Sequence, residues 1–76
     1  MIAHLPVVTG KELVRALQKV EWEVFHVRGS HYQLEHSETK RKITVPVHAG
    51  KEIKRGLLRS ILRDLGISVE QFRSLI

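Results

Sequence analysis

Cysteine is absent from this sequence of 76 residues, and so are long apolar runs. Without cysteine the chain can form no disulfide, thiolate metal site or cysteine nucleophile. At a length where secreted domains usually need disulfides, this favours a reducing compartment. No stretch approaches the ~18 consecutive apolar residues of a membrane span, and the first residues lack the features of a signal peptide. We therefore expect one cytoplasmic domain over residues 1–76 that does not enter a membrane and is too small for a deep cleft between domains.

Motifs for cofactors and metals are missing as well. The sequence contains no GxxxxGK[ST] phosphate loop, no GxGxxG and no nucleophile elbow, so nucleotide-cofactor chemistry is not supported. Its histidines form no H-x-H, no pair at i and i+4 and no HExxH, the spacings that would favour a zinc site. The five histidines are His4, His26, His31, His36 and His48. We expect neither a cofactor nor a bound metal.

The charge is the informative part of the composition. Thirteen lysines and arginines against eight acidic residues give a net charge of +5 and a pI of about 10.1. Residues 1–38 hold four basic and five acidic groups, a net of −1, whereas residues 39–76 hold nine and three, a net of +6. A polyanion is the natural partner of such a half, because each neutralised phosphate releases counterions. Charge alone equally fits a basic surface that serves solubility.

Hydrophobic periodicity and turn residues predict the element order α-β-β-β-α with a short additional C-terminal helix. Capping-box patterns, Thr9 with Glu12 and Ser68 with Gln71, begin the first and last helices, and Gly66 is placed to end the second. The predicted elements are a helix at about 10–20, strands at 21–28, 31–36 and 42–47, a helix from Lys51 to Leu65 and a short helix after Ser68. This is an α+β fold like that of double-stranded RNA-binding domains, with helices on one face of a three-stranded antiparallel sheet.

Two details of these elements bear on the packing. Pro46 cannot donate to a ladder, so the third strand belongs at an edge of the sheet. The stripe of the second helix includes Leu57 together with Ile53, Leu58, Ile61, Leu62 and Leu65. In the first strand, Trp22 and Val24 compete with Phe25 and Val27 for the core, and the sequence leaves that choice open.

His31 is the candidate catalytic residue. It directly follows Gly29 and Ser30, where backbone can approach a ligand closely, and the alternation that buries Tyr32 and Leu34 places it on the opposite face. A histidine can accept a proton at neutral pH, and RNA offers the ribose 2′-OH beside its phosphodiester. One general base could then cleave RNA without a metal, leaving a 2′,3′-cyclic phosphate and a 5′-OH. Spacing alone favours the alternative, a polar residue on the solvent side of a strand.

Basic residues at the start of the second helix are the candidate phosphate ligands. Lys51, Lys54 and Arg55 combine cationic side chains with the exposed N–H groups and positive dipole of a helix N-terminus. Arg59 shares the side of the helix that carries Lys51 and Arg55. Gly56 either lets a phosphate approach the backbone or marks a tight contact between helix and sheet.

Four segments together resemble the HicA (YcfA-like) toxins of toxin–antitoxin pairs. They are residues 9–13 (TGKEL), 29–31 (GSH), 46–53 (PVHAGKEI) and 56–63 (GLLRSILR), in the expected order and spacing. The resemblance implies a fold similar to the double-stranded RNA-binding domain, a metal-independent mRNA endoribonuclease that blocks translation, and neutralisation by a HicB-like antitoxin protein. The family's catalytic histidine falls on His31. Many members carry a second histidine where this chain has Tyr32, and His48 or a water would then protonate the leaving oxygen.

Two other functions remain open at this point. A non-catalytic module of the same fold would bind double-stranded RNA without cleaving it. A protein-interaction domain would use its basic face only for an acidic partner.

Overall fold

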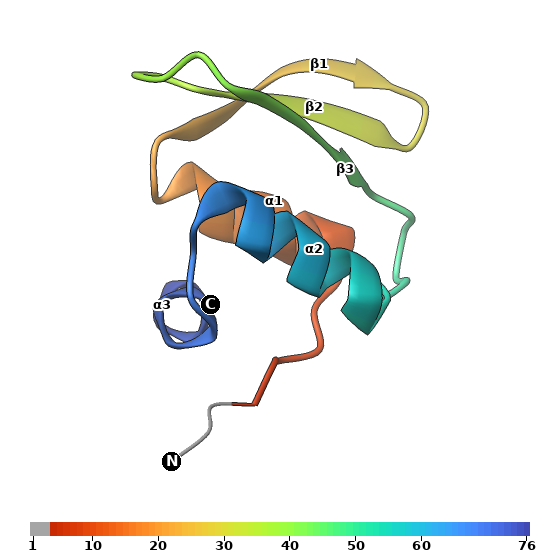
Figure 1. The fold of residues 1–76 in the computed structure, drawn as a ribbon. Coiled ribbons are helices and arrows are strands. Elements are labelled where there is room, and N and C mark those ends of the chain that lie inside the picture. Colours follow the sequence, from red (N-terminus) through yellow and green to blue (C-terminus); the bar gives the residue numbers. More distant parts are fainter. Residues whose placement is uncertain (1–3) are drawn as a thin grey trace.

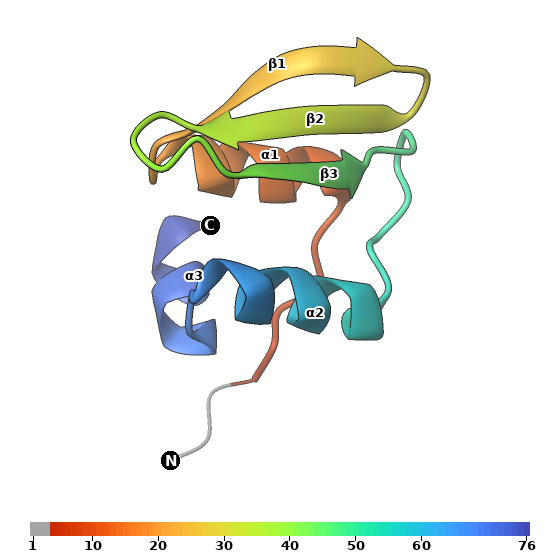
Figure 2. The same cartoon turned by 45° about the horizontal axis from the view of Figure 1, so that its top comes forward.

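The computed structural model describes residues 4–76 and contains three helices and one antiparallel sheet. The elements are α1 (Gly10–Gln18), β1 (Trp22–Arg28), β2 (His31–His36), β3 (Lys42–Pro46), α2 (Arg55–Leu65) and α3 (Val69–Leu75). The strand order is β1-β2-β3, so Pro46 lies on an edge strand, as predicted. Figures 1 and 2 show α1 and α2 on the same side of the sheet. The predicted α+β class is confirmed, and the arrangement is consistent with a double-stranded RNA-binding-domain-like fold.

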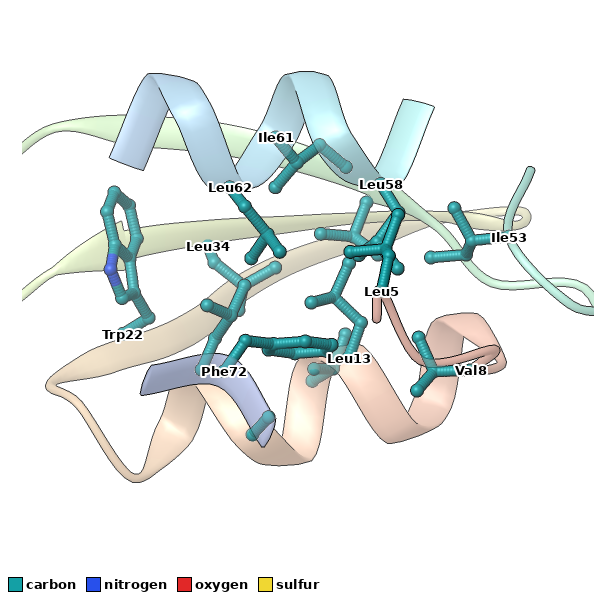
Figure 3. Close-up of a cluster of buried hydrophobic side chains, with 14 residues drawn as sticks. Leu5, Val8, Leu13, Trp22, Leu34, Ile53, Leu58, Ile61, Leu62 and Phe72 are labelled. Atoms are coloured by element: carbon teal, nitrogen blue, oxygen red, sulfur yellow. The ribbon is translucent and has the colours of Figure 1, made fainter. Parts of the chain in front are cut away.

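The core lies between the sheet, α1 and α2 and is closed by α3 (Figure 3). Leu34 of the central strand, Leu13 of α1 and Phe72 of α3 are fully buried. Residues before the first helix contribute too: Leu5 and Val8 are buried, whereas residues 1–3 lie outside the described residues. The amino-terminal segment is thus part of the folded unit from residue 5 onward.

The predicted helix signals are confirmed. The Thr9 N–H donates to the Glu12 carboxylate at 2.8 Å and the Glu12 N–H donates to the Thr9 hydroxyl at 3.2 Å, a complete capping box. Ser68 and Gln71 form the same pair of bonds at the start of α3. Gly66 ends α2 with a φ of +71°, a conformation that glycine adopts without the penalty of a Cβ.

The start of the second helix differs from the prediction. α2 begins at Arg55 rather than Lys51, because the preceding residues are held by the amino-terminal segment: Glu52 forms an isolated β-bridge with Thr9, and the Ile53 N–H donates to the Val8 carbonyl at 2.8 Å. Lys51 therefore precedes the helix instead of sharing a face with Arg55. Leu57 falls in the first helical turn and is 43% exposed, so its assignment to the buried stripe was wrong.

A β-bulge decides which side chains of the first strand are buried. The register of β1 against β2 shifts between Val24 and His26, leaving Phe25 as the extra residue. Trp22 is 4% exposed and Val24 packs against the core, whereas Phe25 and Val27 are each 48% exposed. The choice that the sequence leaves open is settled in favour of Trp22 and Val24.

Candidate nucleic-acid interface

His31 is the first residue of β2 and is exposed on the face of the sheet opposite the helices, called here the outer face. Its ladder partners are Arg28 on β1 and Pro46 on β3. Strand alternation puts the next residue, Tyr32, on the helix side, where it packs against the core. Any side chain at position 32, tyrosine or histidine, therefore points to the helix side and does not lie beside His31 on the outer face.

The turn before His31 is a two-residue hairpin connection anchored to β3. Gly29 has a φ of +59° while Ser30 keeps a negative φ, the pattern of a type II′ turn with glycine at its first central position. The Ser30 carbonyl accepts a 2.6 Å hydrogen bond from the Val47 N–H, just after β3 ends. The backbone that carries His31 is thus fixed on both sides. Gly29 and Ser30 thus have a structural role, and their shaping of a catalytic site stays a prediction.

A pocket of ≈ 290 Å³, called here the lysine pocket, opens beside the end of β3. Its lining residues are Pro46, His48, Lys51, Glu52, Ile53, Lys54 and Leu57. Pro46 both lines this pocket and pairs with His31, and neighbouring strands lie about 4.8 Å apart. The structure therefore brings the predicted Lys51 and Lys54 to one hollow that starts one strand away from His31.

The N-terminus of α2 adjoins the lysine pocket and is open to solvent. Its cap residue, Lys54, makes no side-chain capping bond, and the first turn of α2 contains no acidic residue. Arg55 is exposed there, and a Cβ added at Gly56 would meet no heavy atom within 4 Å among the described residues. The tight helix–sheet contact considered for Gly56 is therefore wrong, and an anion can approach this backbone. The helix dipole favours negative charge at the same place.

Arg59 faces a different part of the surface. It lines a separate pocket of ≈ 190 Å³ with Leu5, Arg63 and residues around the start of α3. The structure thus does not bring Arg59 into the lysine pocket. Two other arginines of the basic half hold the fold together, because the guanidinium of Arg41 donates to the Asp64 carbonyl and that of Arg73 donates to the His4 carbonyl, both at 2.9 Å.

Two other histidines, His36 and His48, lie in different surroundings. The Nδ1 of His36 accepts bonds from the Glu38 and Thr39 N–H groups at 3.2 Å, and its ring meets Trp22 edge-on at 5.2 Å between centroids. His48 is exposed in the lysine pocket, where the turn through Gly50 returns the chain, with the Lys51 N–H bonded to the His48 carbonyl at 2.9 Å. Within residues 4–76, no three acidic or histidine side chains are grouped as metal ligands would be.

Fold and surface together define a small basic α+β domain that presents an exposed histidine next to a lysine-lined hollow. Residues 10–67 match the family model described as the HicA toxin of bacterial toxin-antitoxin systems. The match covers well over half of the 76 residues, and the chain therefore belongs to the HicA toxin family. Membership supports a toxin role in a toxin–antitoxin system. The comparisons with curated proteins and with solved structures found no match.

None of the helices in the described part of the chain is long and apolar enough to cross a bilayer.

Proposed function

We propose that this protein is a metal-independent mRNA endoribonuclease, the toxin of a type II toxin–antitoxin pair, which inhibits translation in the cytoplasm. The observation that carries the proposal is the position of His31. It is exposed on an uncovered sheet face, on a backbone anchored by the Ser30–Val47 hydrogen bond, and one strand away from the lysine pocket. Family membership supports the same reading.

His31 acts as the general base. Its imidazole takes the proton of a ribose 2′-OH, and the 2′-oxygen attacks the adjacent phosphorus as the bond to the 5′-oxygen breaks. The leaving 5′-oxygen takes a proton from His48 or from a water. The products are a 2′,3′-cyclic phosphate and a free 5′-OH. No metal is required, because the substrate carries its own nucleophile in position for attack.

The basic residues hold the RNA backbone. Lys51 and Lys54 bind phosphates in the lysine pocket, and Arg55 adds to the open N-terminus of α2. Arg59 contacts a phosphate farther along the strand, since it faces another hollow one turn later on α2. A HicB-like antitoxin neutralises the toxin by covering the His31 face.

The decisive experiment incubates the purified protein with mRNA in EDTA. We expect the wild type to cleave, His31→Ala to bind without cleaving, and RNA methylated on its 2′-oxygens to stay intact. The fragments should carry 2′,3′-cyclic phosphate and 5′-OH ends. Binding without cleavage by the wild type would refute the enzyme and favour the non-catalytic RNA-binding module. RNA affinity that hardly changes with salt would instead favour a domain for an acidic protein partner.

A further inference from the structure

Phe25 stands out among the aromatic side chains. Of the four in the sequence, all within the described part of the chain, Trp22 and Phe72 are buried and Tyr32 is half-buried, whereas Phe25 is exposed. The ring of Phe25 therefore does not pack in the core. The bulge at Val24/His26 is what turns this side chain out of the core, so its exposure is built into the strand pairing.

Phe25 shares the outer face with His31. The ring lies near Lys42, whose Nζ is 5.3 Å from the ring centroid, and Lys42 pairs with Glu35 on the face that also carries His31 and Gln33. Figures 1 and 2 show α1, α2 and α3 on the other side of the sheet, so among the described residues no helix covers this face. The exposed aromatic ring and the candidate base are therefore open to the same ligand.

A shallow hollow of ≈ 250 Å³, called here the Phe25 hollow, lies beside the ring of Phe25. It is lined by Phe25, Gln33, Lys42, Ile43 and Thr44, and Gln33 and Thr44 are direct cross-strand partners. An aromatic ring stacks on any nucleobase, while an amide and a hydroxyl can both donate to and accept from the edge of a base. The ammonium of Lys42 can bind a phosphate.

We propose that the Phe25 hollow is a nucleobase subsite that selects an unpaired nucleotide next to the scissile bond. Phe25 stacks on the base, Gln33 and Thr44 contact its edge, and Lys42 moves from the ring to a backbone phosphate. The proposal rests on the function proposed above and adds to it the substrate class, single-stranded RNA. A base inside a duplex is already stacked and paired, so it cannot lie flat on Phe25.

The spacing fits neighbouring nucleotides. Gln33 is two residues beyond His31 on the same face of β2, which places their Cα atoms about 7 Å apart at a rise of ~3.3 Å per residue. Sheet-based RNA binders likewise stack two or three bases on side chains of their strands. The contact of Lys42 with Phe25 does not block the subsite, because a cation–π pair at an exposed position is weak.

The polar lining favours RNA over a protein partner. The core of a protein–protein interface is rich in apolar groups and poor in charged ones. The Phe25 hollow adds only Ile43 to the ring and combines them with an amide, a hydroxyl and an ammonium. The acidic residues of the outer face, Glu23 and Glu35, pair with each other, and Glu35 also pairs with Lys42 at the edge of the Phe25 hollow. From the hollow toward His31, the cross-strand pairs include Arg28 and no acidic residue, so charge favours a polyanion that runs in this direction.

The test measures binding of fluorescent octanucleotides of A, C and U by anisotropy, in EDTA and in a His31→Ala background that keeps the RNA intact. We expect Phe25→Ala to weaken single-strand binding about 5- to 150-fold, the effect of removing one stacked base. Phe25→Trp should preserve the affinity, because it keeps a stacking ring. Gln33→Ala should change the order of preference among the three oligonucleotides.

The matched control is Val27→Ala. Val27 is as exposed as Phe25, but it pairs with Tyr32 and therefore belongs to the helix side of the sheet. We expect Val27→Ala to leave single-strand binding unchanged. We also expect an eight-base-pair RNA duplex to bind with the same affinity to the protein with Phe25→Ala and to the His31→Ala background without it. Unchanged single-strand binding by Phe25→Ala would overturn the subsite, as would an equal loss for duplex and single strand.

Failure of the subsite and failure of the nuclease are distinguishable. If the wild type cleaves RNA and Phe25→Ala does not change binding, the proposed nuclease activity is supported and the subsite is refuted. Conversely, binding that depends on Phe25 without any cleavage by wild type supports the subsite and refutes the nuclease. Thermal unfolding of each variant verifies that affinity is compared between folded proteins.

Discussion

Gly10 is a glycine that the fold requires for close approach. It is the first residue of α1 and is buried against the end of β3. A Cβ built there would overlap the Pro46 carbonyl oxygen and come within 2.8 Å of the Val47 Cα, and both are backbone atoms. Side-chain rotation cannot relieve these contacts, so Gly10→Ala must push α1 away from β3.

The two glycines at helix starts predict opposite results for the same substitution. Overpacking lowers the free energy of unfolding by about 1–3 kcal/mol, whereas replacing glycine by alanine in a helix raises it by at most about 1 kcal/mol. Because the contacts of Gly10 are with backbone, we expect a net loss of about 1–2 kcal/mol in the free energy of unfolding. Gly56→Ala adds a methyl group in open space, so we expect a gain of up to about 1 kcal/mol.

Thermal and urea unfolding measure this difference. In a domain of this size 1 kcal/mol shifts Tm by roughly 4–8 °C, so Gly10→Ala should melt about 4–16 °C below the wild type. Displacing Pro46 and Val47 also disturbs the Ser30–Val47 hydrogen bond that anchors the turn before His31. RNA cleavage by Gly10→Ala should therefore fall even at temperatures where the variant is fully folded. Equal stability of the two alanine variants would refute the reasoning.

Three further predictions concern charge, pH and the core. Lys51→Gln and Lys54→Gln should each make the fall of the RNA-binding constant with salt less steep, by about 0.7 in the slope of log K against log salt for single-stranded RNA. The control is Lys40→Gln at the opposite end of the sheet, which should leave this slope unchanged. Hydrogen bonding of the Glu12 carboxylate to the Thr9 backbone N–H, and secondarily to the Thr9 side chain, lowers the pKa of Glu12 below its ordinary 4.5. The lowered pKa stabilises the fold above the pKa of Glu12 in the unfolded chain, and this stability is lost as pH falls through the pKa in the folded protein. In urea titrations, the free energy of unfolding should therefore fall less between neutral and acidic pH for Glu12→Gln than for the wild type. Phe72→Ala, at a residue 0% exposed, should cost about 3–5 kcal/mol, whereas Ile76→Ala, at an exposed residue, should stay within about 0.5 kcal/mol.

The parts of the fold that were predictable from the sequence depend on local chemistry. The capping boxes at Thr9 and Ser68 and the left-handed Gly66 satisfy backbone groups within a few residues, so their patterns are complete in a short stretch of sequence. The strand order also followed, because short turns join neighbouring strands and Pro46 requires an edge.

The features that were missed depend on contacts between distant segments. Residues 51–54 have a composition compatible with a helix, but the bridge from Thr9 to Glu52 and the hydrogen bond from the Ile53 N–H to the Val8 carbonyl keep them extended. The bulge at Phe25 has no glycine to signal it, since it arises from the pairing of β1 with β2. The close approach at Gly10 depends on the end of β3. In each case the partner lies elsewhere in the sequence, where periodicity carries no information.

On the proposed function, these long-range contacts also determine how the basic half of the chain binds RNA. Arg41 and Arg73 are engaged with backbone carbonyls, while Lys42 lies beside Phe25 on the outer face and Lys51 and Lys54 lie in the lysine pocket beyond Pro46. His31 is between these two positive regions, because Gln33 continues its face toward the Phe25 hollow and Pro46 leads to the lysine pocket. On the proposed function, a single strand crosses the sheet with one base on Phe25 and its downstream phosphates at the lysines, which leaves the scissile bond at His31.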